Sequence, residues 1–211
     1  MLDKLKQLFN LKTTTEVTPT VEEKIEEAFN SLGEDVVRLE FGEDVTAFSY
    51  LILEKINEFR ENLKLDTGFI FPPVHVLQND DLQENEIVFY VRGKEAEHEF
   101  LIPNKESVDK YISETLTKLF ETNIDEIFTM EYLERYINKV QSINSWLVWD
   151  ISKQLGAYEI KTILVNVLKQ KKSIADINRV FEKIDECLAE NRDFCHVWKP
   201  EIVSKRICKE I

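Results

Sequence analysis

Hydrophobic residues recur along the chain with two periods, one typical of strands and one typical of helices. They alternate with polar residues at 37–41, as in a half-buried strand, and at 87–91 Ile87, Phe89 and Val91 take every second position of another predicted strand. From Asp44 to about Lys64 they recur at intervals of three and four, which predicts an amphipathic helix that ends at Gly68. From Ser107 onward the pattern is helical. We therefore predict an α+β fold, in which a small mixed sheet with a packed helix is followed by an all-helical subdomain.

Glycine and proline place the turns of the predicted sheet. Pro72 and Pro73 lack the N–H that a central strand needs, so we place them at the entrance of a strand. Gly93 and Lys94 fit a two-residue hairpin turn with glycine first. Alternation beyond that turn predicts three residues that face the core, which are Ala96, His98 and Phe100.

Local signals also divide the helical part. A break is predicted near Asn123, and Gly156 separates two further helices. Thr129 and Ser173 are predicted N-caps, because their hydroxyls can accept a hydrogen bond from the first helical turn. Pro200 suits the first position of a last helix.

Residues 1–11 differ from the rest of the chain in charge. Their lysines make the segment basic, and a helix would gather its apolar residues in one broad stripe. The stripe consists of Leu2, Leu5, Leu8, Phe9 and Leu11. Residues 12–20 read as an extended linker, residues 21–106 as an α/β subdomain with a short leading helix, and residues 107–211 as the helical subdomain.

The charge balance limits the partners. The 211 residues carry a formal net charge of -13, which repels a phosphate backbone, so we expect no nucleic-acid partner. Three cysteines without metal-ligand spacing, and the absence of an apolar signal core, indicate a reducing, cytoplasmic location. A basic amphipathic segment at residues 1–11 also allows a peripheral contact with the inner face of the membrane.

No motif for catalysis, cofactor binding or metal binding is present. The chain has no Gly-rich phosphate loop, no H-E-x-x-H and no G-x-S-x-G. His75, His98 and His196 fall on different predicted elements. Cys195 and His196 are neighbours in the sequence, and neighbouring side chains on a helix point in different directions, so we favour ordinary thiols over a Cys/His site. We therefore expect a non-enzymatic protein with no catalytic, cofactor-binding or metal-binding residue.

Two tryptophans remain open to two interpretations. Trp146 and Trp149 are three residues apart and lie on one face of a helix. Such a pair is more often core than contact surface, and we favour the core. Aromatic residues also anchor interfaces, so an interface is the alternative.

The residues from the first predicted strand to the hairpin turn at Gly93 resemble a known family. LEFG, a helix, GFIFPPVHV, a polar turn and ENEIVFYVRG follow one another in the order found in the FHIPEP family. These are the FlhA-like export-gate proteins of flagella and type III secretion systems. ILVNVLKQKKSIADINRVFEKI continues the similarity, which covers about residues 36 to 190. Matching positions include Gly68, Pro72, Pro73, Asn79, Gly93 and Asp176, for which we predict structural roles.

The departures from the family narrow what the resemblance implies. The chain lacks the family's membrane half and its C-terminal thioredoxin-like subdomain, so we expect no membrane channel from it alone. Residues 102–105 lead directly from the predicted sheet to the next helix, at the point where the family inserts a chaperone-binding subdomain. We therefore expect no chaperone-binding site. What remains resembles the ring-forming part of the cytosolic domain. It implies a protein-interaction module, in or beside protein export, with export-apparatus partners and weak homo-oligomers; the alternative is a diverged adaptor or regulatory protein that lost the export role.

A vesicle test separates the uses of residues 1–11. We favour docking of this segment on a protein surface, either of a partner or of its own domain, because ten residues form a marginal isolated helix. We therefore expect the wild type not to sediment with anionic liposomes at low salt. Salt-sensitive sedimentation that disappears in a Leu5→Glu, Phe9→Glu variant would instead identify a membrane-binding segment.

Overall fold

The computed structural model describes residues 35–190 and 199–210, which belong to one compact unit. The predicted N-terminal helix at 1–11, the linker at 12–20 and the short helix predicted from Val21 lie outside the described residues. Within the described part, none of the helices has the length and apolar character needed to cross a bilayer.

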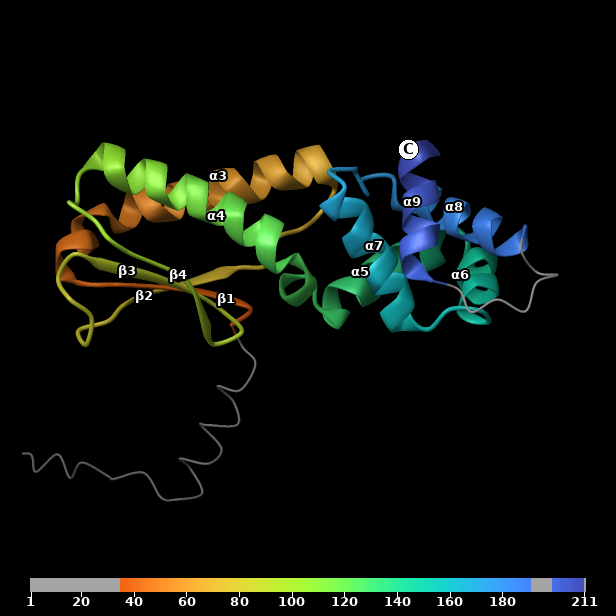
Figure 1. The fold of residues 1–211 in the computed structure, drawn as a ribbon, viewed down its shortest axis with the longest axis horizontal. Helices are drawn as coiled ribbons and strands as arrows, with labels where there is room; N and C mark the ends of the chain where they lie inside the picture. The colour runs from red at the N-terminus through yellow and green to blue at the C-terminus, as the bar shows by residue number, and fades with distance from the viewer. Residues whose placement is uncertain (1–34, 191–198, 211) are drawn as a thin grey trace, which may run out of the picture. The chain divides into compact units, whose positions relative to one another are not determined.

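Strands come first and helices dominate afterwards (Figure 1). The strands are β1 (Val37–Phe41), β2 (Val74–Gln78), β3 (Glu86–Val91) and β4 (Lys94–Phe100). A 3-10 turn, η1 (Glu43–Phe48), leads into α3 (Ser49–Thr67) between the first two strands. The remaining helices are α4 (Lys105–Ile127), α5 (Met130–Ile143), α6 (Ser145–Ser152), α7 (Ala157–Lys169), α8 (Ile177–Ala189) and α9 (Pro200–Glu210).

The strands form one mixed sheet in the order β2-β1-β3-β4. β1 and β2 run parallel, as expected for strands connected by a helix, whereas β1 with β3 and β3 with β4 are antiparallel. The prediction of an α+β fold with a small mixed sheet is therefore confirmed.

Both α3 and α4 cover the same face of the sheet (Figure 1). Alternate residues of the central strands point toward them, among them Leu39 and Phe89, which are fully buried. Ile52 and Ile56 of α3 meet this layer, as does Ile112 of α4. Because α4 begins at Lys105 and packs beside α3, the sheet and the first helix of the helical half share one core. The division into two subdomains near residue 106 stays a prediction.

The turn between β3 and β4 lies one residue earlier than predicted. Arg92 and Gly93 both have positive φ, 48° and 72°, and Lys94 already belongs to β4. Two successive left-handed residues define a type I′ turn, whose twist matches that of the flanking strands. The prediction of Gly93-Lys94 as the turn is wrong because the arginine adopts the left-handed conformation.

A β-bulge in β4 changes which side chains of the strand face the core. Tyr90 pairs with Glu95 and Phe89 with Glu97, which leaves Ala96 as the extra residue. Ala96 packs against the core as predicted, but the strand beyond it is turned over, so Glu97 faces α4 and binds Lys118 at 2.7 Å. The core-facing prediction is therefore wrong for His98 and Phe100, which are exposed on the opposite face.

Helix ends in the second half follow the local signals in most places. Thr129 accepts a hydrogen bond from the Tyr132 amide, so the predicted cap of α5 is confirmed. Asn123 has non-helical backbone angles inside α4, at the predicted break. The cap of α8 is Asp176, whose carboxylate accepts from the Arg179 amide at 3.0 Å. Ser173, predicted as the cap, instead accepts from the Ala175 amide in the preceding turn.

Gly68 joins α3 to the helical half at very short range. It ends α3 in the left-handed conformation, with φ of 74°. A Cβ at this position would lie 2.3 Å from Cα and from the backbone nitrogen of Ala175, closer than any side chain can approach. A hydrogen bond of 2.7 Å from the Ile174 amide to the Thr67 carbonyl joins the two backbone segments at this contact.

The Tyr136 hydroxyl of α5 closes the other side of this junction. It donates to the Gly68 carbonyl at 2.9 Å and accepts from the Ile70 amide at 3.0 Å. Burial raises the pKa of Tyr136, so the hydroxyl stays protonated and keeps its donor. Between them, Phe69 is fully buried and stacks on Phe128 at 5.3 Å between ring centroids. The chain leaving α3 is thereby fixed to the helices that follow.

Substitution of Gly68 tests this junction. Gly68→Ala should lower the free energy of unfolding by about 3 kcal/mol or more, because the left-handed strain adds to a backbone clash with Ala175. Gly93→Ala is the matched control, since Gly93 has nearly the same φ but nothing within 4 Å of the added Cβ. It should cost only about 1 kcal/mol. Equal losses in urea unfolding would show that the close contact contributes nothing.

Candidate interaction surfaces

The residues of the family resemblance lie at turns, strand entrances and helix ends. Pro72 and Pro73 immediately precede β2, and Asp176 caps α8. The amide of Asn79 donates to the Glu40 carboxylate at 2.8 Å, and its backbone N–H donates to the Phe41 carbonyl at 2.9 Å. These contacts fix the end of β2 against β1.

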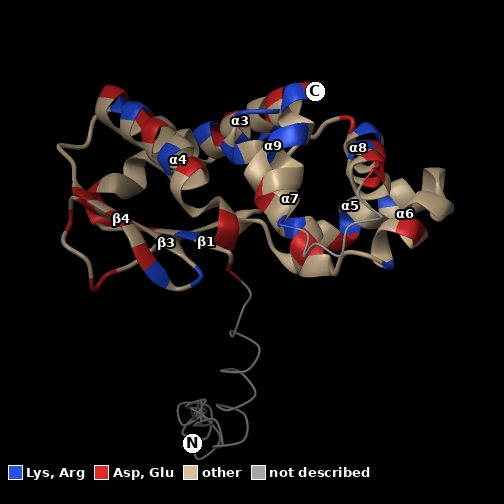
Figure 2. Ribbon diagram, turned by 45° about the vertical axis from the view of Figure 1, so that its right-hand side comes forward, with Lys and Arg blue, Asp and Glu red and all other residues tan. Residues whose placement is uncertain are grey.

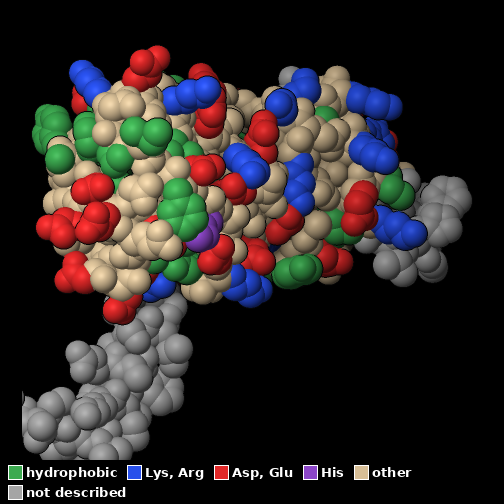
Figure 3. Space-filling model, turned by 60° about the vertical axis from the view of Figure 1, so that its left-hand side comes forward, with side chains coloured by type: hydrophobic (Ala, Val, Ile, Leu, Met, Phe, Trp, Pro, Cys, Tyr) green, Lys and Arg blue, Asp and Glu red, His purple; other side chains and the backbone are tan. Residues whose placement is uncertain are grey.

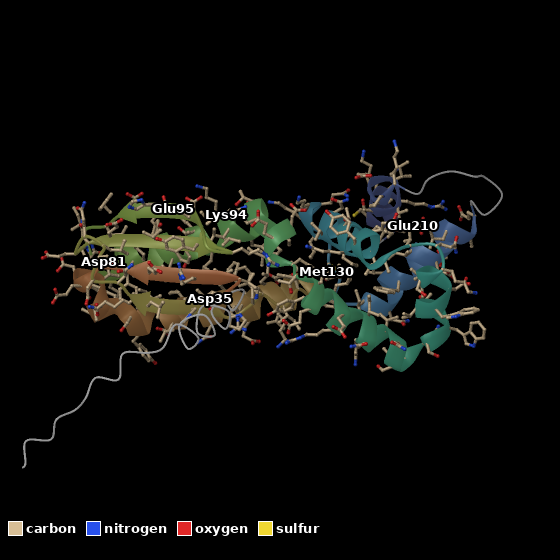
Figure 4. All side chains as sticks on the ribbon, turned by 90° about the horizontal axis from the view of Figure 1, so that it is seen from below. Asp35, Asp81, Lys94, Glu95, Met130 and Glu210 are labelled. Atoms are coloured by element: carbon tan, nitrogen blue, oxygen red, sulfur yellow. The ribbon has the colours of Figure 1, made fainter. Side chains whose placement is uncertain are left out.

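The face of the sheet that turns away from α3 and α4 carries a cluster of paired polar side chains at its centre, beside the buried Val88 (Figure 4). Arg38 forms an ion pair of 2.9 Å with the nearly buried Glu40 and lies 4.8 Å from the centre of the Tyr90 ring. Glu40 also accepts from Asn79, so its two carboxylate oxygens face different partners, one the Arg38 guanidinium and the other the Asn79 amide. This central cluster offers no reactive group.

The two described histidines lie on opposite edge strands. His98 contacts Glu86 at 3.0 Å and Glu95 at 3.5 Å, and His75 contacts Asp35 at 2.8 Å. Two strands separate β2 from β4, which places the histidines about 14 Å apart at the usual strand spacing. Their partners Glu95 and Asp35 are labelled on either side of the sheet in Figure 4. Among residues 35–190 and 199–210, no cluster of three ligand-type side chains could hold a metal ion.

The described thiols are buried in the helical half. Cys187 of α8 and Cys208 of α9 are nearly inaccessible, and burial raises the pKa of both. A raised pKa keeps a thiol protonated, which is the opposite of what a nucleophile needs. Cys195 and His196 lie outside the described residues.

Trp146 and Trp149 protrude from α6. Their side chains are 70% and 49% exposed, and their rings meet edge to face at 4.6 Å. Leu147 and Ile151 occupy the inner face of this short helix and are buried. The prediction that the tryptophans belong to the core is therefore wrong. We call the two exposed rings the tryptophan knob.

A single lysine accompanies the knob. The Lys153 ammonium lies 2.9 Å from the centre of the Trp149 ring and forms a cation–π contact with it. Lys153 also forms an ion pair with Asp150 at 3.5 Å. Figure 2 shows α6 as a largely uncharged ribbon in a molecule with charges on most other helices. An aromatic pair with little charge around it has the composition of an interface centre.

A groove runs between α3 and α4 and reaches α7. It consists of two adjoining hollows of ≈ 390 and ≈ 420 Å³ that share Phe59, Leu63, Asp66 and Thr117. Buried Leu63, Ile124 and Leu168 form its floor, and Phe59 and Phe120 form half-buried walls. We call this surface the α3–α4 groove. Its apolar floor suits an apolar side chain rather than a charged small molecule.

Charges on the rim of the groove are unequally paired. Lys171 binds Glu121 at 3.0 Å, Lys169 binds Asp125, and Lys55 binds Asp109 at 2.9 Å. Asp66 on the α3 side makes no ion pair within the described part of the chain. The groove therefore presents one carboxylate without an ion pair, on its α3 wall.

Apolar side chains are also exposed where β4 joins α4 and where α3 begins. Ile102 is 84% exposed in the loop before α4, and Phe100 is exposed at the end of β4. Tyr50 and Leu53 are exposed at the beginning of α3. Figure 3 shows apolar side chains gathered among acidic ones over the sheet half of the molecule. This surface lacks the defined hollow that the α3–α4 groove provides.

Sequence reasoning missed the groove. Periodicity describes one helix at a time, whereas the hollow depends on how three helices meet. Sequence did indicate the knob, as the alternative to a core position. The signal that decides between the two is the Leu147 and Ile151 pair, which takes the inner face of α6.

Comparisons with known proteins agree with the fold. No protein-family model matches the chain, and no curated protein matches it by sequence. Among solved structures, the CdsV protein of Chlamydia pneumoniae is similar with a TM-score of 0.68 and 13% identity, over 82% of this chain and 64% of that one. The CdsV and CdsO complex of the same bacterium gives 0.65, 13%, 81% and 65%. The nonameric EscV cytosolic domain from the type III secretion system gives 0.64, 16%, 84% and 64%.

The described fold is thus that of the cytosolic domains of type III secretion export-gate proteins. The expected resemblance to the FHIPEP family is confirmed at the level of fold. The chain spans about two thirds of the length of these neighbours.

Proposed function

We propose that the chain is a non-enzymatic protein-interaction module that acts in or beside a type III-like export apparatus, in the position of the ring-forming part of an export gate. The observation that carries this proposal is the agreement of fold over 82% of the chain with CdsV. The chain with this fold also has Gly68, Pro72, Pro73 and Asn79, which are among the positions where its sequence resembles the FHIPEP family.

The surface of the helical half supports an interaction role. Trp146 and Trp149 expose two large rings, and aromatic residues of this kind commonly supply most of the binding energy of an interface. Their exposure is unexplained by packing, because α6 already buries Leu147 and Ile151. We infer that the tryptophan knob is the centre of a protein contact.

The proposed partners are proteins. They include components of an export apparatus and further copies of the chain in a weak homo-oligomer, since the EscV neighbour is a nonameric assembly. Nucleic acid does not fit the net charge of -13. We place the protein in the cytoplasm, at the inner face of the membrane, where an export gate presents its cytosolic domain.

A diverged adaptor is the second candidate. One observation favours it: residues 101–104 connect β4 directly to α4, at the place where the family inserts its chaperone-binding subdomain. An adaptor would retain the surfaces that contact other proteins but would not bind export cargo.

Self-association should depend on the knob. In sedimentation velocity, the wild-type sedimentation coefficient should rise with protein concentration, and a Trp146→Ser, Trp149→Ser variant should stay monomeric at concentrations where the wild type associates. The variant should remain folded, with a free energy of unfolding within about 1 kcal/mol of wild type, because both rings are largely exposed.

Tyr158→Ser is the matched control, since this aromatic side chain is 73% exposed and belongs to α7 rather than to α6. It should associate as the wild type does. Equal loss in the control would indicate a general effect of surface polarity, and unchanged association of the double variant would exclude the knob from the contact.

A binding assay separates the export role from the adaptor role. CdsV forms a complex with CdsO, so the counterpart of CdsO from the organism that encodes this chain is the partner to test. We expect the purified proteins to bind each other in biolayer interferometry. Absence of binding, with a positive control from the organism's own export gate, would favour the adaptor.

A further inference from the structure

The hollow of ≈ 420 Å³ at the α7 end of the α3–α4 groove is lined mainly by apolar side chains. Buried Leu63, Ile124 and Leu168 form its floor, and the half-buried rings of Phe59 and Phe120 form its walls. We call it the apolar hollow. Its volume is in the lower part of the range of pockets that hold drug-sized ligands, so it has room for an indole ring.

Both wall rings of the apolar hollow are fixed from behind. Phe59 meets the buried Phe71 edge to face at 5.2 Å between ring centroids, and Phe120 lies 5.6 Å from the buried Phe69. Because these contacts belong to the core, an incoming ring would bury apolar area without first having to order the walls. Aromatic rings attract one another beyond the effect of their buried area, so an aromatic side chain is the occupant that gains most.

The tryptophan knob is a protruding aromatic feature of the same chain. Trp146 is 70% exposed, and Trp149 is 49% exposed and carries the Lys153 ammonium on its ring. Trp146 is therefore the ring that is more open to a partner. The knob belongs to α6 and the apolar hollow to α3, α4 and the end of α7, and both are open in the described part of the chain. A knob can thus fill a hollow only on another copy.

Self-association through the knob has two possible forms. In a two-fold contact a knob would meet a knob, which brings two protruding ring pairs together and places the two Lys153 ammonium groups in one interface, where they repel. In a heterologous contact the knob meets a different surface of the next copy. A ring of the kind proposed above requires the heterologous form, because each subunit must present two different surfaces to its two neighbours.

Charges at the rim of the apolar hollow favour the same pairing. Asp66 is exposed on the α3 wall and makes no ion pair within the described residues, whereas Lys169 and Lys171 are already paired. Lys153 at the knob pairs with Asp150 at 3.5 Å. An ammonium has three donors, so Lys153 can keep this pair and also donate to a carboxylate across an interface.

We propose that the tryptophan knob of one copy inserts into the apolar hollow of a second copy. Trp146 enters between Phe59 and Phe120, and Lys153 meets Asp66 at the rim. The contact joins two different surfaces, so each bound copy still offers a knob or a hollow to the next. This inference rests on the self-association in the proposed function and names the surface that receives the knob.

Sedimentation velocity of two variants, alone and mixed, tests the pairing. Trp146→Ser, Trp149→Ser lacks a knob and keeps its hollow. Thr117→Arg keeps its knob and lacks an open hollow, because Thr117 is exposed on the wall and an arginine there occupies the space beside Asp66. Each variant alone should associate at least about thirtyfold more weakly than the wild type. An equimolar mixture should regain association as a species of two chains and no larger, since one knob and one hollow remain intact.

Thr122→Arg is the matched control for the hollow variant. Both threonines are exposed on α4, and each donates its hydroxyl to the carbonyl four residues earlier. Thr122 lies about 140° around the helix from Thr117 and lines none of the hollows described. This control should associate as the wild type does, and an equal loss in it would count against the hollow.

Two results would overturn the pairing and leave the knob in the contact. They are wild-type association of Thr117→Arg, and a mixture of the two folded variants that stays monomeric. A monomeric wild type, or a knob variant that associates as the wild type does, would instead overturn the proposed self-association and this inference together. Circular dichroism of each variant establishes that it is folded, and recovery of association in the mixture excludes misfolding as the cause of its loss.

Discussion

The architecture depends on the close approach of two backbone segments at Gly68. A residue with a side chain would collide with Ala175, so the segment that follows α7 can lie against the end of α3 only because this position is glycine. Hydrogen bonds from Ile174 and Tyr136 then satisfy the backbone groups that the turn exposes. A sheet with its two helices and a bundle of further helices thereby share one continuous core rather than meeting through a loose linker.

This junction also explains where contact surfaces can form. With the ends of α3, α4 and α7 held together, a hollow remains between them, floored by Leu63 and Leu168. On the far side of the bundle, α6 is anchored by Leu147 and Ile151 and presents its tryptophans outward. The hollow and the tryptophan knob are therefore two separate exposed surfaces of the same compact unit.

The sequence predicted those features that local chemistry decides. Thr129 and Gly68 end or begin helices through groups within a few residues, so their roles follow from spacing alone. Features that depend on distant packing were predicted poorly. One extra residue at Ala96 exchanged the two faces of β4, a change that alternation cannot reveal. The exposure of Trp146 followed from competition between two apolar faces of one short helix, and the groove followed from three helices meeting.

The short connection between β4 and α4 has a consequence for how such proteins change over evolution. Asn104 and Ser107 cap each other reciprocally, so α4 begins from a local signal. Ile102, just upstream, has an exposed side chain, and its carbonyl accepts only from the capping residues Asn104 and Ser107. Additional polypeptide can therefore enter or leave here without disturbing a strand ladder or a helix start. A whole module can be gained or lost at this point while the remaining body folds unchanged.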